Sequence, residues 1–190
     1  VIDEAHKHGI KVHAHASNNR DQKDALRAGV DLLVHAVANE KIDAELIGLV
    51  KEKKPYWTPV MGLVADRSEL CEPGNPFVEQ AHSDETIADL RSSPREGVEY
   101  LYPSIGTCKP ITGAAAQAGA AREGIRRENF KTMIESGARL VLGTDTGVFP
   151  SYSFGWADHH ELAKYVQFGL TPAQALVAEA LAAPGGEDGE

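Results

Sequence analysis

The feature of this chain that most restricts its fold is a repeated change from helix to strand at a glycine. Three helical stretches end at Gly9, Gly29 and Gly137, and an apolar stretch follows each glycine at once. Glycine readily takes the left-handed backbone conformation that ends many helices. The strands predicted from the apolar stretches are 10–14, 30–34, 56–60 and 138–143, of which 56–60 follows its helix without a glycine. Because these strands are apolar almost throughout, we expect parallel strands that are covered on both faces.

Helical stretches lie between and after the predicted strands, at 21–28, 43–53, 112–136, 156–168 and 172–182. This alternation is typical of βα units, of which the sequence contains four. A closed barrel of eight strands needs twice that number and typically about 250 residues. We therefore expect an α/β fold in which this chain of 190 residues supplies half of a (β/α)8 TIM-type barrel or part of an open sheet.

The stretch 61–111 interrupts the alternation between the third and fourth predicted strands. It is polar and contains Pro73, Pro76, Pro94 and Pro103. Long connections of this kind are usually lids, binding segments or disordered loops. We expect this insertion to lie outside the barrel wall, over the carboxyl ends of the strands. Residues 1–182 are predicted to form one domain, and residues 183–190 a flexible tail.

Composition favours a globular protein that binds a small molecule. Hydrophobic residues make up 42% of the chain and charged residues 25%, which is ordinary for a protein with a buried core. The formal net charge of -9 argues against a nucleic-acid-binding surface. No apolar stretch approaches the roughly 18 residues of a membrane span, so we expect no membrane partner. Association into a homo-oligomer is left open.

The ends of the sequence and its cysteines say little about cellular location. Residues 1–9 have the pattern of a helix and not that of a signal sequence, so we expect the true N-terminus to be missing. Cys71 and Cys108 are too few and too far apart for a disulfide framework or a thiolate zinc cluster. A cytoplasmic location is slightly favoured, although the sequence does not determine it.

Three side chains that can bind a metal stand where predicted strands end. His15 follows the first strand, His35 the second and Asp145 the fourth. In parallel α/β folds the carboxyl ends of the strands form the ligand site, so these side chains are expected to converge there. Two imidazoles and a carboxylate suit a divalent ion such as zinc, manganese or iron.

Each of these residues also has a simpler explanation. A histidine at a strand end is often a hydrogen-bonded structural residue, and an aspartate in a turn often caps a helix. The occurrence of all three at equivalent places in a repeated unit favours the metal site. His13 is an alternative ligand because it points to the same face of the strand as His15. His15 is preferred because it is nearer the carboxyl end.

Several longer runs surround these positions. They are His15 and Ala16; residues 25–31 together with His35; Thr58 and Pro59; Asn129 together with residues 143–147; Glu161 and Leu162; and residues 169–176. Together these runs resemble the amidohydrolase superfamily, in the branch of imidazolonepropionase-like enzymes and metal-dependent Xaa-Pro and Xaa-Arg dipeptidases. The resemblance extends from residue 1 to about residue 178 and is weakest in the insertion.

The resemblance implies that the chain is the C-terminal half of the barrel, with strands five to eight and the long insertion after strand seven. It implies that His15 and His35 bind a divalent metal, most simply zinc, with one or two ions in the complete enzyme. Asp145 would bind the same metal and act as general base. The reaction would be hydrolysis of a C–N bond in an amide, a lactam or a dipeptide.

Two parts of the family pattern are absent from the sequence. Family members carry a His-x-His pair after the first strand and usually a carboxylated lysine after the fourth, and both would precede Val1. The His13 and His15 pair has the same spacing, but its surroundings fit the fifth strand better. We therefore expect a chain truncated at both ends that, alone, hydrolyses amides poorly or not at all.

Other residues and functions rank below this interpretation. Thr58, at the end of the third strand, and His159 and His160, on a helix beyond the site, are candidates for substrate contact, with packing or a solvated helix face as the alternative. A serine hydrolase is disfavoured because the chain has no Gly-x-Ser-x-Gly motif. The main rival is a non-catalytic half-barrel that acts as a structural or interaction module.

Overall fold

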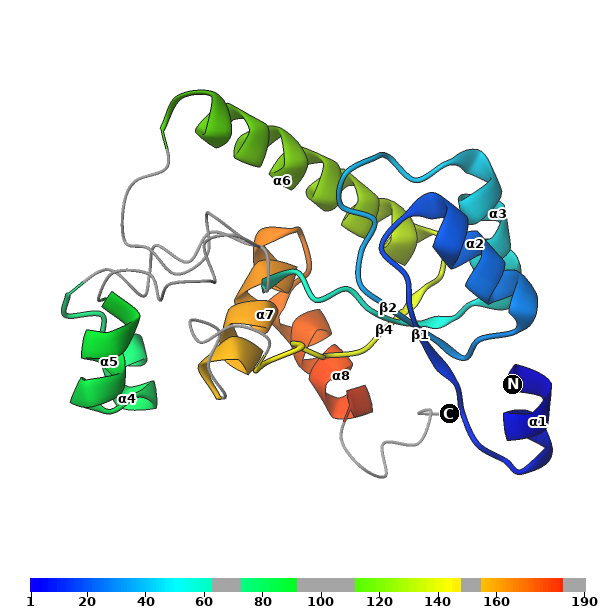
Figure 1. Cartoon of the computed structure of the whole chain (residues 1–190), viewed down its shortest axis with the longest axis horizontal. Coiled ribbons are helices and arrows are strands. Elements are labelled where there is room, and N and C mark those ends of the chain that lie inside the picture. Colours follow the sequence, from blue (N-terminus) through cyan, green and yellow to red (C-terminus); the bar gives the residue numbers. More distant parts are fainter. Residues whose placement is uncertain (63–72, 92–111, 148–154, 183–190) are drawn as a thin grey trace.

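A computed structural model describes residues 1–62, 73–91, 112–147 and 155–182 of the chain. Within these ranges helices and short strands alternate (Figure 1). In chain order they are α1 (Ile2–Lys7), β1 (His13–His15), α2 (Asn19–Ala28), β2 (Leu32–Val34), α3 (Ala44–Lys53), β3 (Tyr56–Thr58), α4 (Pro76–Ala81), α5 (Asp84–Arg91), α6 (Gly113–Glu135), β4 (Arg139–Leu140), α7 (Trp156–Gln167) and α8 (Pro172–Ala182).

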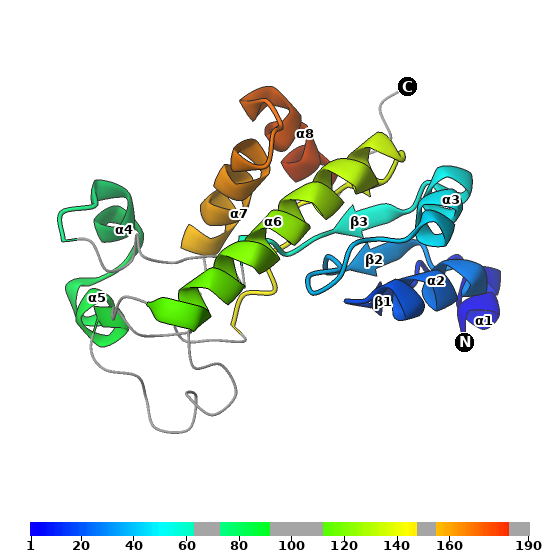
Figure 2. The ribbon, with the colours of Figure 1, turned by 90° about the horizontal axis from the view of Figure 1, so that it is seen from above.

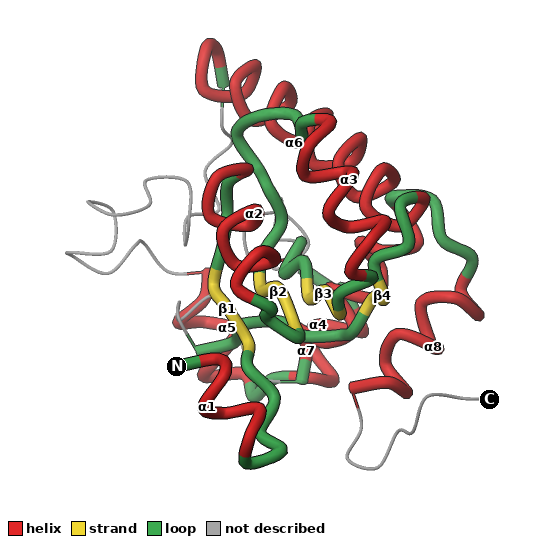
Figure 3. The backbone as a smooth tube through the Cα atoms, turned by 90° about the vertical axis from the view of Figure 1, so that its right-hand side faces the viewer, coloured by secondary structure: helices red, strands yellow, loops and turns green. Residues whose placement is uncertain are grey.

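The four strands form one parallel sheet in the order β1-β2-β3-β4. This confirms the predicted α/β fold with parallel strands. The register pairs His15 with Val34 and Val34 with Thr58, so the carboxyl ends of the first three strands are level with one another. Figure 3 shows α2, α3 and α6 on one side of the strands.

The strands are shorter than predicted. β1 begins at His13, three residues later than expected, and Ile10 is exposed. β4 ends at Leu140, three residues earlier than expected; after it the Val141 N–H donates to the carbonyl of Trp57 and the Leu142 N–H to the carbonyl of Ala178 in α8. The expectation that both faces of every strand are covered is wrong for β1, where His13 and His15 are exposed.

The helix ends follow from capping residues in the sequence. Gly9, Gly29 and Gly137 have φ values of 69°, 89° and 95°, which is the left-handed conformation predicted at these helix stops. At the opposite ends, the side chains of Asn18 and Asp43 accept hydrogen bonds from the first turns of α2 and α3. The three glycines therefore precede β1, β2 and β4, and the two side-chain caps fix where α2 and α3 begin.

An aromatic cluster fixes the sheet to the helices. The ring of Phe130 in α6 lies 5.7 Å from Trp57 of β3, 5.5 Å from Tyr165 of α7 and 5.7 Å from Phe168. All four side chains are buried. Aromatic rings at such distances add attraction beyond their buried area. The cluster therefore holds the end of β3 rigidly beside α6 and α7.

The described part of the 61–111 insertion contains α4 and α5, two short helices that the sequence interpretation did not predict. Figure 2 shows them on the side toward which the strands run. Residues 63–72 and 92–111 lie outside the described ranges, as does the expected tail at 183–190, so the lid and the tail stay predictions. No helix in the described part of the chain is both long and apolar enough to cross a membrane.

Candidate functional site

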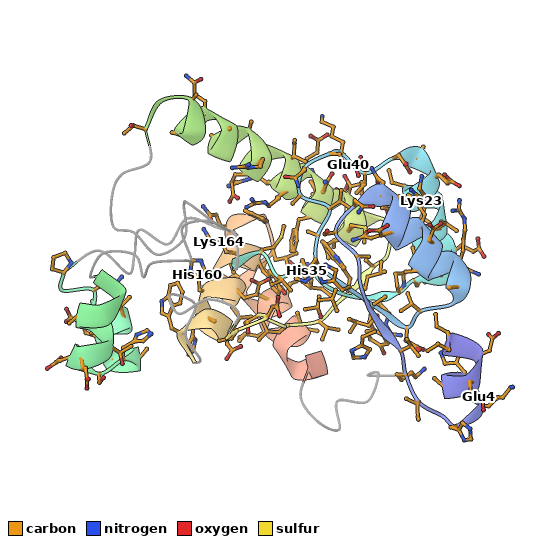
Figure 4. All side chains as sticks on the ribbon, viewed as in Figure 1. Glu4, Lys23, His35, Glu40, His160 and Lys164 are labelled. Carbon is orange, nitrogen blue, oxygen red and sulfur yellow. The ribbon has the colours of Figure 1, made fainter. Side chains whose placement is uncertain are left out.

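The three predicted ligands come together at the carboxyl ends of the strands. The His15 ring, at the end of β1, meets the His35 ring, directly after β2, edge to face with 4.4 Å between their centroids. His35 also approaches Asp145, with 3.8 Å between Nε2 and Oδ2. His35 is thus the central member of a row of three, and Figure 4 labels it at the sheet.

His35 has an unusual backbone conformation that several hydrogen bonds hold in place. Its φ is 78°, a left-handed value that a non-glycine residue adopts at a cost of about 1–3 kcal/mol. The His35 N–H donates to the carbonyl of Thr58 at 2.8 Å. The His35 carbonyl accepts from Gln22 Nε2 and from Trp57 Nε1, each at 3.0 Å. The neighbouring strand and helix together keep this residue in position.

The surroundings of His35 favour the neutral imidazole. Burial lowers the pKa of His35, the nearby His15 lowers it further, and Asp145 opposes both effects. The His35 side chain is 15% exposed, whereas that of Asp145 is 40% exposed. A neutral imidazole has a free nitrogen lone pair, which is the form that binds metals.

The segment that carries Asp145 lies tightly against β3. A β-carbon at Gly143 would come within 2.4 Å of Thr58 Cγ2, so a larger residue at this position would force the Thr58 side chain or one of the two segments to shift. Asp145 itself has a left-handed φ of 54°, and the hydroxyl groups of Thr144 and Thr146 share a hydrogen bond beside it. Gly143 lies two positions before Asp145, so its close approach to Thr58 places the segment with Asp145 beside the carboxyl end of β3.

The donor set can be tested against the size of a metal ion. Among the described residues, no group of three or more His, Cys, Asp or Glu side chains is arranged to hold a metal ion as it stands. Two ligands of one zinc ion, each about 2.0–2.2 Å from it, lie roughly 3–3.5 Å apart. The 3.8 Å between His35 Nε2 and Asp145 Oδ2 is close to that separation, and the His15 ring contacts the His35 ring. The residues present therefore fit a zinc ion in donor chemistry, while their side chains would have to rearrange to surround it.

The other predicted site residues have more varied positions. His13 is exposed at the start of β1, while the ring contact with His35 is made by His15. Thr58 is buried next to Gly143. On α7, His159 is exposed, whereas His160 is 2% exposed and stacks on Trp156 with 4.5 Å between ring centroids. Figure 4 shows His160 apart from His35. A role for His159 or His160 in substrate contact stays a prediction.

One charged residue near the end of β3 was given no role by the sequence interpretation. Glu161 of α7 is fully buried, and its carboxylate accepts hydrogen bonds from the backbone N–H groups of Met61 and Gly62. Burial raises the pKa of Glu161 from 4.5 to about 7, although these hydrogen bonds act in the opposite direction. A residue pattern could not reveal this contact, because its partners are about 100 positions apart in the chain.

Comparison with known proteins supports the fold. No protein-family model matches the chain. No curated protein matches it either. Among solved structures, the chain is similar to a Xaa-Pro dipeptidase that was crystallised with methionine bound in its active site, with a TM-score of 0.56 and 18% sequence identity. The match covers 94% of this chain and 34% of the dipeptidase, so this chain spans about a third of that protein's length.

Proposed function

We propose that the chain carries part of the active site of a metal-dependent hydrolase that cleaves C–N bonds, on part of a (β/α)8 barrel. The observation that carries the proposal is the row formed by His15, His35 and Asp145 at the carboxyl ends of parallel strands. Ligands gather at this end of α/β barrels. The similarity in fold to a Xaa-Pro dipeptidase is consistent with this proposal.

Each residue of the row has a distinct part in the proposal. His15 and His35 would each bind a divalent metal, most simply zinc, through a ring nitrogen. The metal, when bound, polarises the scissile carbonyl and makes a water molecule more acidic. Asp145 binds at the same place and accepts the proton of the attacking water, which it then passes to the leaving amine. The substrate is a small amide, lactam or dipeptide.

Asp145 is suited to this role by its position at the rim of the site. Its side chain is 40% exposed, so one carboxylate oxygen can face the metal while the other meets water and substrate. His35, by contrast, is held from three directions through its backbone. In this proposal the firmly held His35 is a metal ligand, and the accessible Asp145 is the general base as well as a ligand.

A second candidate function is a structural or interaction module without catalysis. Within the described part of the chain, the outer strands β1 and β4 each pair with a single neighbour, and His13 and His15 on β1 are exposed. An unpaired strand edge is a surface on which a further strand can add. In this case a second copy or another chain would cover β1, and no metal would bind.

Zinc binding by equilibrium dialysis separates the two candidates. The proposal expects binding at the row that is weakened by His15→Ala, His35→Ala and Asp145→Asn. His8→Ala is the matched control, since His8 is an exposed histidine directly after α1 and takes no part in the row. The metal-dependent function would be refuted if none of the three row variants changed zinc binding, or if His8→Ala weakened it equally. The structural or interaction module would then be the remaining candidate.

A further inference from the structure

Two buried side chains meet on a single backbone oxygen of the candidate site. Gln22, on α2, is 1% exposed, and Trp57, on β3, is also 1% exposed. Each donates one N–H to the carbonyl of His35 at 3.0 Å. The second hydrogen on Gln22 Nε2 is directed to the carbonyl of Ala16, also at 3.0 Å.

The two carbonyls bound by Gln22 belong to the site. Ala16 directly follows His15, and the other carbonyl is that of His35 itself. One amide group therefore links the ends of β1 and β2 at the point where each strand delivers its histidine. The orientation of the amide is unambiguous because both of its partners are carbonyl oxygens, which only the NH2 group can satisfy.

The Gln22 amide is kept in the interior at a cost. Its oxygen, Oε1, is buried and accepts no hydrogen bond from the described residues. A buried acceptor without a partner costs about 1–3 kcal/mol. An apolar side chain of similar length would avoid that cost but would take a donor away from the carbonyls of Ala16 and His35. The two donated hydrogen bonds are therefore what the glutamine contributes at this position.

The His35 backbone is the part of the site that needs such donors. Its left-handed φ of 78° is unfavourable for a side chain with a β-carbon. Such conformations persist where the surroundings hold them. The direction of the Cα–Cβ bond follows from the backbone, so holding the carbonyl also sets where the imidazole lies relative to His15 and Asp145.

We propose that Gln22 and Trp57 are positioning residues, whose N–H groups hold the His35 carbonyl and so place the His35 imidazole between His15 and Asp145. Neither side chain bonds to the metal or the substrate in this proposal. It rests on the proposed metal site for its function, while the positioning itself is a property of the metal-free protein. Partners that orient metal ligands typically change metal affinity 10–100-fold when removed.

Three variants of the full chain test the proposal. Gln22→Met keeps the length of the side chain and removes both donors, and Trp57→Phe keeps an aromatic ring against Phe130 and removes one donor. Asn19→Leu is the control: Asn19 lies one turn before Gln22 on α2 and donates its amide to the carbonyl of Lys41, away from His35. Each variant removes at least one hydrogen bond from a side-chain N–H to a backbone carbonyl, and Asn19→Leu also removes the acceptor of the Asp43 N–H.

Two measurements are made on each variant. The first is the nuclear Overhauser effect between the ring protons of His15 and His35 in the metal-free protein. The second is the zinc dissociation constant, from competition with a chromophoric chelator. We expect Gln22→Met and Trp57→Phe to weaken or abolish the ring contact and to weaken zinc binding about 10–100-fold. Asn19→Leu should lower the melting temperature but leave both readouts near those of the unmodified chain.

The results distinguish this inference from the proposed function. An unchanged ring contact in Gln22→Met and Trp57→Phe, or an equal loss in Asn19→Leu, would overturn the positioning role. If the unmodified chain binds no zinc, the proposed function fails, but the ring contact still decides whether Gln22 and Trp57 place His35. If Gln22→Met does not fold, Trp57→Phe decides alone.

Discussion

Gly143 lies so close to Thr58 that a β-carbon at Gly143 would be 2.4 Å from Thr58 Cγ2. Non-bonded carbon atoms do not approach to this distance, so either the Thr58 side chain or one of the two segments would have to move. Gly143 precedes Asp145 by two positions, and Thr58 ends β3. The distance between β3 and the segment that carries Gly143 therefore affects the position of Asp145, a proposed metal ligand.

We predict that Gly143→Ala destabilises the protein by about 1–3 kcal/mol, the usual cost of overpacking, and weakens zinc binding by displacing Asp145. Thr58→Ser should suppress both effects because it removes Cγ2. The next nearest atoms, Thr58 Oγ1 and Cβ, would be at ordinary contact distances of 3.5 and 3.6 Å. Urea unfolding of the two single variants and the double variant measures the coupling. Equal destabilisation by Gly143→Ala in both backgrounds would contradict the contact.

Glu161 is predicted to make stability fall as the pH rises through neutrality. Burial raises the pKa of Glu161 from 4.5 to about 7. Between these two pH values the folded protein therefore binds more protons than the unfolded chain. The stability that Glu161 contributes is fully present below about pH 4.5 and is lost as the pH rises through about 7. Urea unfolding from pH 5 to 8 should show this decline, and Glu161→Gln should remove the part of the slope that Glu161 causes. An identical slope in Glu161→Gln would show that another group is responsible.

Asp31 is predicted to contribute stability in the opposite pH direction. Burial alone would raise its pKa, but hydrogen bonds from the Val12 N–H, His6 and Lys11 outweigh burial and lower the pKa of Asp31 from 3.8 to about 2. Its contribution, up to about 2 kcal/mol, is present above pH 3.8 and is lost as the pH falls through about 2. Asp31→Asn should therefore destabilise the protein at pH 7.

The matched control for Asp31 is Asp24→Asn. Asp24 is an exposed aspartate of α2 that pairs with Arg27 on the same helix, and exposed pairs of this kind contribute little. The difference between the two variants in unfolding free energy should shrink toward zero between pH 4 and pH 2. A difference that stays constant over this range would mean that the Asp31 carboxylate does not stabilise the segments where β1 and β2 begin.

We expect this chain, supplied with excess zinc or manganese, to hydrolyse dipeptides and lactams poorly or not at all. His15 is exposed and Asp145 is 40% exposed, so water screens the charges at the site. Electrostatic stabilisation of a transition state depends on keeping that water out. The assay includes Asp145→Asn as its control. Robust turnover that this substitution abolishes would show that the three residues suffice for catalysis.

Much of the sheet and the relative placement of the site residues follow from local patterns. Gly9, Gly29 and Gly137 mark helix ends because left-handed backbone favours glycine, and parallel strands bring their carboxyl ends together whatever their lengths. His15, His35 and Asp145 could therefore be selected from the sequence by their place after apolar runs.

The remaining features depend on contacts between distant segments. The apolar run 138–143 does not show that β4 stops at Leu140, nor that the Leu142 N–H donates to the carbonyl of Ala178 in α8. In the sequence Gln22 looks like any polar residue of a helix, although its amide donates to the carbonyls of Ala16 and His35, directly after β1 and β2. The left-handed φ of His35 is visible only once the groups that hold it are placed.

The most direct test of the central claim is a crystal structure of the chain with zinc, with the ion located by anomalous scattering at the zinc edge. The account predicts one ion within about 2.0–2.2 Å of a ring nitrogen of His15, a ring nitrogen of His35 and a carboxylate oxygen of Asp145. A zinc ion bound elsewhere on the chain, or no ion at these residues when zinc is saturating, would contradict it.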